Sequence, residues 1–193
     1  MIKKIVKDTL ALVVIALVAV LCLAGVYALT KQHIADAEYN EKIAAYQEVC
    51  SGAETFEDFE VKTTVSADGN VKINEVKLAK NADGDNVGYV LLITTNQGYG
   101  GDITLSMGVL ADGSIAGVKV ISMSETPGLG AKCTEESWTS QFKGINAEKV
   151  ESTKDGKVKD NEIDAISGAT YTTEAVVGAV NFGLEVMGEV SAK

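Results

Sequence analysis

Hydroxyl side chains gather at residues 164–173, in the sequence DAISGATYTT, directly ahead of a long apolar stretch. Apolar residues in that stretch recur at the 3.6-residue spacing of a helix, which predicts a helix from about Thr173 to Val190. The start of a helix presents unpaired backbone N–H groups and the positive end of the helix dipole, and both favour phosphate binding. The segment is therefore a candidate phosphate site, with capping of the helix by the same hydroxyls as the structural alternative.

Two other glycine-containing loops precede this segment. They are NQGYGGDI at residues 96–103 and SETPGLGAKC at residues 124–133, and the second contains the only proline of the chain. Taken singly, each is also typical of an ordinary turn, because glycine and proline are the usual turn residues.

The composition excludes several classes of function. The chain has 17 Lys and no Arg against 27 Asp and Glu, which argues against a nucleic-acid partner. One histidine, His33, and three cysteines are too few for the usual zinc, haem or iron–sulfur ligand sets and for Ser–His–Asp or Cys–His catalysis. We therefore predict no metal site and no catalytic residue. Cys50 and Cys133 are either paired in a disulfide or, as the sequence favours, two buried free thiols.

The beginning of the chain predicts a membrane anchor. Residues 9–30 contain no charged side chain and are long enough to cross a bilayer as a helix. Lys3, Lys4 and Lys7 precede them, which predicts that residues 1–8 stay in the cytoplasm and that the rest of the chain faces outward. A cleavable signal peptide is the weaker alternative, because its apolar core is usually about 7–15 residues long. Lipidation at Cys22 is also disfavoured, because Leu21 before it is not small.

The remaining pattern predicts one α+β domain. Residues 31–50 are expected to form a helical stalk, and residues 51–193 a single extracytoplasmic domain. Strands are predicted at residues 71–80 and 86–96, and two more within residues 102–123, joined by the Asp112-Gly113 turn. A short amphipathic helix is predicted at residues 134–144. The expected fold is thus one N-terminal transmembrane helix followed by a mainly antiparallel sheet with flanking helices.

The three loops together resemble a known family. DAISGAT is similar to the D-x-x-S-G-A-T motif at which a dedicated flavin transferase esterifies FMN to the final threonine, and GYGGDI and ETPGLG resemble the other two signature loops of the same FMN-binding domain, in the family's order. With one membrane helix and a length of 193 residues, the chain is similar to the G subunits of Rnf electron-transport complexes. The C subunits of sodium-pumping NADH:quinone oxidoreductases share the domain but are usually longer. One position departs from the pattern, because Met123 stands where the family often has histidine.

The resemblance implies a set of site residues. Thr170 would carry FMN through a phosphodiester bond, and Asp164 would belong to the segment that the flavin transferase recognises. For Ser167, Thr172 and Thr173, capping of the helix remains an equal alternative to phosphate binding. The implied non-covalent contacts to the cofactor are Glu125, Thr126, Pro127, Gly128, Leu129, Ser167, Gly168, Ala169, Thr172 and Thr173.

The implied function is electron transfer. The chain would be the flavoprotein subunit of an ion-translocating ferredoxin:NAD⁺ oxidoreductase, a translocase, in the cell membrane, with the other membrane and peripheral subunits of the Rnf complex as partners. No G-x-G-x-x-G follows a strand, so we expect no NAD site of its own. Three alternatives remain open at this point: a C-type subunit of the sodium-pumping enzyme, a free-standing anchored flavin carrier, and an exported binding module without flavin.

Overall fold

The computed structural model describes residues 2–191, in two units that divide between Glu41 and Lys42. The first unit consists of helix α1 (Ile2–Val49) up to Glu41. From Leu12 onward this helix contains an 18-residue window with a mean hydropathy of 2.9, and none of that window is buried within the protein. It is long and apolar enough to cross a membrane, as the sequence predicts.

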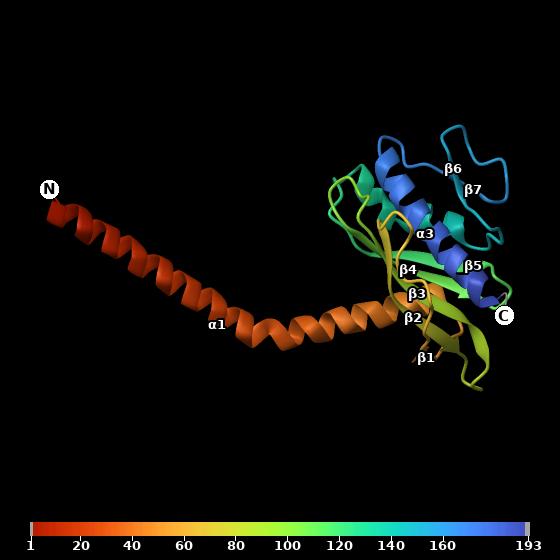
Figure 1. Cartoon of the computed structure of the whole chain (residues 1–193), viewed down its shortest axis with the longest axis horizontal. Helices are drawn as coiled ribbons and strands as arrows, with labels where there is room; N and C mark the ends of the chain where they lie inside the picture. Colours follow the sequence, from red (N-terminus) through yellow and green to blue (C-terminus); the bar gives the residue numbers. More distant parts are fainter. Residues whose placement is uncertain (1, 192–193) are drawn as a thin grey trace. The chain divides into compact units, whose positions relative to one another are not determined.

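The second unit is built on a five-stranded antiparallel sheet (Figure 1). Its strands are β1 (Thr55–Asp58), β2 (Val71–Lys80), β3 (Asn86–Thr95), β4 (Ile103–Leu110) and β5 (Ile115–Ser122), and they lie side by side in sequence order. The β4–β5 hairpin closes at the predicted Asp112-Gly113 turn, where Gly113 adopts a φ of 86°. The predicted α+β fold with a mainly antiparallel sheet is confirmed.

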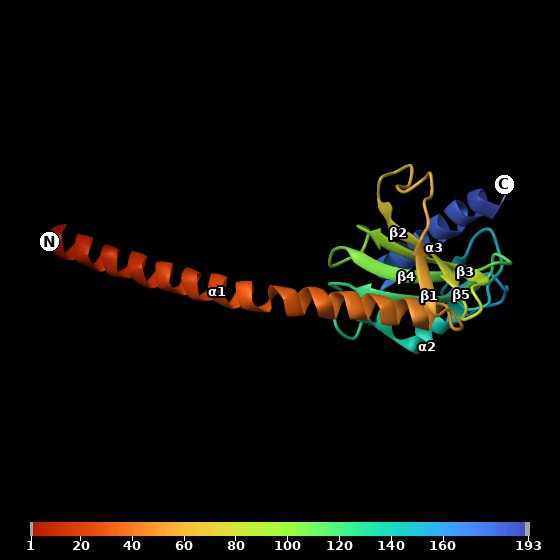
Figure 2. The same cartoon turned by 90° about the horizontal axis from the view of Figure 1, so that it is seen from below.

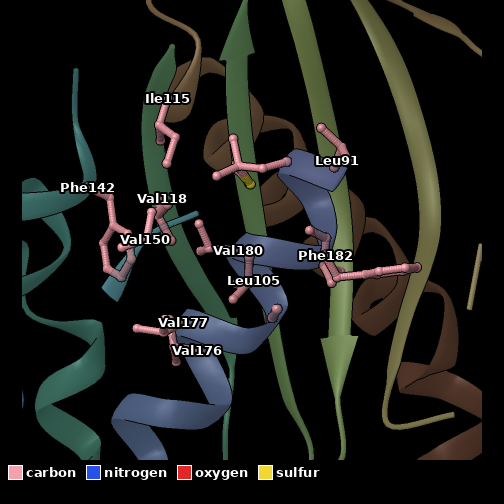
Figure 3. Packing of buried hydrophobic residues seen from close by; sticks show 14 of the residues in the cluster. Leu91, Leu105, Ile115, Val118, Phe142, Val150, Val176, Val177, Val180 and Phe182 are labelled. Carbon is pink, nitrogen blue, oxygen red and sulfur yellow. The ribbon is translucent and has the colours of Figure 1, made fainter. Parts of the chain in front are cut away.

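Helix α3 (Thr170–Ser191) lies along one face of this sheet, as Figures 1 and 2 show. Its apolar stripe, seen at Val176, Val177 and Val180 in Figure 3, packs against side chains such as Leu91 and Leu105 of β3 and β4. The helix begins three residues earlier than predicted, because the Ala169 carbonyl already accepts the first helical hydrogen bond, from Thr173 N–H at 3.0 Å.

The last two turns of α1 cover the opposite face of the sheet. Tyr46 and Val49 are buried there with Val90 of β3, whose neighbour Leu91 points into the α3 core. Gly108 of β4 and its cross-strand partner Gly117 of β5 give the helix room, because a Cβ on Gly108 would lie 2.2 Å from the Val49 carbonyl oxygen. The segment expected to be a stalk is therefore helical through Val49, but from Lys42 onward it belongs to the same compact unit as the sheet.

Between β5 and α3 the chain departs from the prediction. The single helix expected at residues 134–144 is three short pieces: η1 (Gly130–Thr134), α2 (Glu136–Thr139) and η2 (Ser140–Phe142). Trp138 and Phe142 are buried together as expected, with ring centroids 5.3 Å apart in an edge-to-face arrangement. A small parallel pair, β6 (Glu151–Thr153) and β7 (Glu162–Asp164), follows and was not predicted.

The cysteines of the second unit are free thiols. Cys50 is buried in the cluster at the end of α1, and Cys133 is buried in the core beneath α3. The disulfide alternative is therefore wrong for this structure.

Candidate functional site

A tight turn leads from β7 into α3. Ala169 N–H donates to the Ile166 carbonyl at 3.0 Å, and Gly168 has a φ of 76°. No non-glycine residue in the described part of the chain has a positive φ, so Ser167 is in the normal region and the turn is type II. Only glycine adopts the Gly168 conformation at no steric cost. The sequence SGA thereby fixes the position from which Thr170 starts the helix.

A second type II turn lies against the first. Leu129 N–H donates to the Thr126 carbonyl at 3.2 Å, with Pro127 and Gly128 between them and a φ of 78° at Gly128. Proline followed by glycine is the sequence that this turn type prefers. The two turns touch, because a Cβ on Gly168 would lie 3.2 Å from the Leu129 side chain.

Glu125 joins all three glycine loops from the inside. Its side chain is only 6% exposed. Oε1 accepts a hydrogen bond from Gly100 N–H at 2.9 Å, and Oε2 accepts one from the Thr172 hydroxyl at 2.6 Å. The backbone of Glu125 is fixed as well, since its N–H donates to the Met123 sulfur at 3.2 Å. The methionine that departs from the family pattern therefore has a structural contact here.

Glycines leave the space that this carboxylate fills. A Cβ on Gly130 would lie 2.4 Å from Glu125 Oε2 and 2.6 Å from Thr172 Oγ1. A Cβ on Gly98 would lie 2.9 Å from Glu125 Oε1. The glycines of the first two loops thus make room for a buried acidic side chain, a role that the sequence pattern alone did not indicate.

The hydroxyls of Thr172 and Thr173 are engaged within the protein. Thr172 donates to Glu125, while Thr173 Oγ1 donates to the Ala169 carbonyl and accepts from Ile166 N–H, both at 3.0 Å. Both residues are buried and lie inside the first turn of α3. These two hydroxyls therefore neither cap the helix nor remain free to donate to a phosphate, the two roles expected from the sequence. They hold the preceding turn and the Glu125 loop in place against the helix.

The helix start itself has no side-chain cap. Ala169 occupies the N-cap position and has no oxygen to offer, although serine, threonine, aspartate and asparagine are preferred there. Within the described residues, the backbone N–H groups of Thr170, Tyr171 and Thr172 have no acceptor, and neither the Thr170 nor the Ser167 hydroxyl makes a hydrogen bond. Thr170 is half-buried and Ser167 is exposed. Three N–H donors and two unbonded hydroxyls therefore point to an anion at this end of α3.

Asp164 lies at the end of β7, on the approach to the first turn. Its carbonyl accepts from the Trp138 indole at 2.8 Å, and its N–H donates to the Gln141 side chain at 2.7 Å. The exposed carboxylate accepts from Lys157 N–H at 2.7 Å. Asp164 is thus held firmly at the surface, separate from the Glu125 cluster.

Cys133 lies in the core beneath the site. Burial, and then the negative charge of Glu125, raise the pKa of its thiol to about 11. The thiol therefore stays protonated at neutral pH and is a packing group there, not a nucleophile.

A large groove of the second unit lies elsewhere. It has a volume of about 1080 Å³ and is lined by the second half of α3, from Gly178 to Gly188, with the loops around Asp68, Asp112 and Glu148. The phosphate site predicted from the sequence is instead an open platform formed by two turns and a helix start.

Comparison with known proteins gives consistent matches. Residues 98–185 match the family described as FMN-binding domain, and residues 1–49 match the family described as the RnfG N-terminal region. The G subunit of the Na(+)-translocating ferredoxin:NAD(+) oxidoreductase complex of Acetobacterium woodii is 34% identical over 98% of this chain and 94% of its own. The G subunit of the ion-translocating oxidoreductase complex of Methanosarcina acetivorans is 35% identical over 95% of this chain and 94% of its own. The crystal structure of Shewanella oneidensis NqrC is similar with a TM-score of 0.52 at 25% identity, covering 75% of this chain and 70% of its own.

Proposed function

The chain belongs to the family of G subunits of ion-translocating oxidoreductase complexes, and on this premise we propose that it is the membrane-anchored flavoprotein subunit of an Rnf-type ferredoxin:NAD⁺ oxidoreductase. It carries electrons between partner subunits and needs no substrate site of its own. Its match over nearly the whole length of these relatives favours a G subunit over a C-type subunit.

FMN is held covalently in this proposal, through a phosphodiester bond to Thr170. The observation that carries it is the free hydroxyl of Thr170 at an uncapped helix start, next to two threonines whose hydroxyls are already bonded. A phosphate monoester or diester fits this position, because it accepts hydrogen bonds from the free N–H groups and gains from the helix dipole. Because Gly168 and Gly128 have no side chain, the two turns leave room for a cofactor to approach the backbone.

These contacts indicate which part of the task belongs to the flavin and which to the side chains around it. When bound, FMN supplies the electron-accepting and electron-donating chemistry. Thr170 fixes the phosphate end, and the first turn of α3 neutralises part of the phosphate charge. Glu125 holds the three loops in register from beneath. Thr126, Pro127 and Leu129, all exposed, border the space above the site.

Maturation and location complete the proposal. A flavin transferase would form the bond from a flavin dinucleotide: Thr170 Oγ bonds to the phosphorus on the flavin side, the pyrophosphate P–O bond breaks, the nucleoside monophosphate leaves, and the hydroxyl proton goes to solvent. The rigid, exposed Asp164 is part of what that enzyme recognises. Lys3, Lys4 and Lys7 keep the N-terminus in the cytoplasm, and the domain lies on the other side of the cell membrane with the remaining Rnf subunits.

Substitution of Thr170 tests the covalent site. Thr170→Ala removes a hydroxyl without a hydrogen-bond partner in the described structure, so the fold changes in stability by no more than about 0.5 kcal/mol. The mass increment of one FMN on the denatured chain disappears. Thr172→Ser is the matched control, because it changes a nearby threonine, keeps the hydroxyl that is bonded to Glu125 and leaves the increment intact. Retention of the FMN mass on the Thr170→Ala chain would disprove the assignment.

A further inference from the structure

Three exposed apolar side chains lie on the segments next to Thr170. In the described part of the second unit, six large apolar residues are exposed, and three of them lie on the site loops: Tyr99 at 75%, Tyr171 at 69% and Leu129 at 45%. Leu129 touches the Gly168 turn, and Tyr171 follows Thr170 directly in the chain. Exposed apolar side chains that gather at one place, while the other three are scattered singly, indicate a binding surface.

Tyr99 comes from the first glycine loop and Tyr171 from the first turn of α3, and the two rings lie next to each other. Their ring centroids are 6.3 Å apart and the ring planes are inclined by 36°. Stacked or edge-to-face aromatic pairs are the favoured arrangements, and this pair is neither, so each ring keeps an exposed surface for another partner.

Both rings stand on rigid supports. Tyr171 belongs to the first turn of α3, which Thr172 ties to Glu125 at 2.6 Å. Tyr99 lies in the loop whose Gly100 N–H donates to the other oxygen of the same carboxylate at 2.9 Å. Glu125 therefore sets the spacing of the two rings from its buried position beneath the loops.

We propose that Tyr99 and Tyr171 form an aromatic platform for the isoalloxazine ring of the flavin attached at Thr170. This inference rests on the proposed function. The phosphate and the five-carbon ribityl chain limit how far the ring can lie from Thr170, and this brings the neighbouring tyrosines into its range. The isoalloxazine ring is planar and largely apolar, and burying it against exposed aromatic surface is favourable. Leu129 closes the platform on the side of the Pro127 turn.

Flavin fluorescence tests the platform directly. A tyrosine in contact with a flavin quenches its fluorescence, because the excited flavin takes an electron from the phenol and returns it without emission. In the flavinylated full-length chain, purified in detergent, Tyr171→Leu and Tyr99→Leu should each raise the fluorescence yield and lifetime severalfold. The double variant should raise them most. Val65→Ala is the control, since it is an exposed apolar residue near Thr63, which contacts Glu189 at the far end of α3.

A mass measurement on each variant separates this inference from the proposed function. The FMN increment should be present in all variants, because Thr170 and its turn are unchanged. Absence of FMN from the wild-type chain would disprove the proposed function. An intact increment with fluorescence equal to that of the wild type overturns the platform. If the leucine variants keep wild-type fluorescence but no longer co-purify with other membrane subunits, the two rings belong to a protein interface, and the platform is likewise disproved.

Discussion

Thr172 Oγ1 donates a 2.6 Å hydrogen bond to Glu125 Oε2, and this contact joins residues 47 positions apart in the chain. It ties the first turn of α3 to the loop that contains Pro127, beneath the surface on which Thr170 lies. Because both side chains are buried, the pair is a support of the site and not part of its exposed surface.

Thr172→Val should weaken the fold and disturb the site. Valine has nearly the shape of threonine but cannot donate, so Glu125 Oε2 is left unpaired. A lost hydrogen bond to a charged group costs about 1.5–3 kcal/mol of unfolding free energy. Urea unfolding measures this cost, and Thr172→Ser, which restores the donor, should recover most of it. Equal stabilities for the valine and serine variants would show that the hydrogen bond contributes nothing.

Thr173→Val should loosen the Ile166–Ala169 turn. The Thr173 hydroxyl accepts from Ile166 N–H, and its loss leaves that buried donor without a partner, at a cost of about 1 kcal/mol. The Thr170 position then becomes less well defined, so FMN attachment should slow while still reaching completion. A time course of the FMN mass increment, with Thr170→Ser as a variant that keeps the turn intact, measures the effect. An unchanged rate would show that the turn does not need this brace.

Gly130→Ala should lower the unfolding free energy, although replacing glycine by alanine usually raises it within a helix. Its Cβ would lie 2.4 Å from Glu125 Oε2, which forces the carboxylate away from Thr172. Overpacking of this kind costs about 1–3 kcal/mol. Gly178→Ala is the control, because Gly178 lies in α3 with open space at its Cβ position, and there alanine should stabilise by about 0.5–1 kcal/mol. Thermal unfolding of both variants checks the predicted opposite signs.

Alkaline pH should destabilise the domain partly through Cys133. In the folded state its pKa is raised from 9.0 to about 11. Between these values the unfolded thiol loses its proton and the folded one keeps it, so the unfolded state binds fewer protons and unfolding becomes more favourable as pH rises. Cys133→Ala is less stable at neutral pH, but its stability should decline less steeply between pH 9 and 11 than that of the wild type. Parallel stability curves for the two proteins would contradict this assignment.

The strands β2 to β5 could be predicted because alternating and β-branched residues carry a local signal. The strands that escaped prediction, β1, β6 and β7, have only three or four residues each, too few for a periodic pattern. The packing of the end of α1 on the sheet was not predicted, for a different reason. Its packing depends on Gly108 and Gly117, which lie far along the chain, and a glycine within a strand signals close backbone approach without naming the partner.

The sequence was enough to predict which loops form the site, but not which of their side chains contact one another. The motif residues indicated Thr170, yet nothing local distinguished its hydroxyl from those of Thr172 and Thr173. That distinction depends on Glu125 and on Ile166 N–H, which only the folded chain brings near. The proximity of Tyr99 and Tyr171 was also not predicted, because it depends on the same folded arrangement of the loops.

The hydrogen bonds of the Thr172 and Thr173 hydroxyls bear on whether the chain folds before or after flavin is attached. In an unfolded chain the three threonines of ATYTT are chemically equivalent alcohols, and an enzyme would have to tell them apart by sequence. Folding withdraws two of them into hydrogen bonds and leaves Thr170 accessible. If FMN is attached at Thr170 as proposed, folding thus adds a second basis for selecting this hydroxyl, beside recognition of the motif that contains Asp164. On this proposal, flavin attachment should follow folding of the domain, and a chain that carries FMN would be one whose Thr172 and Thr173 hydroxyls are already hydrogen-bonded within the protein.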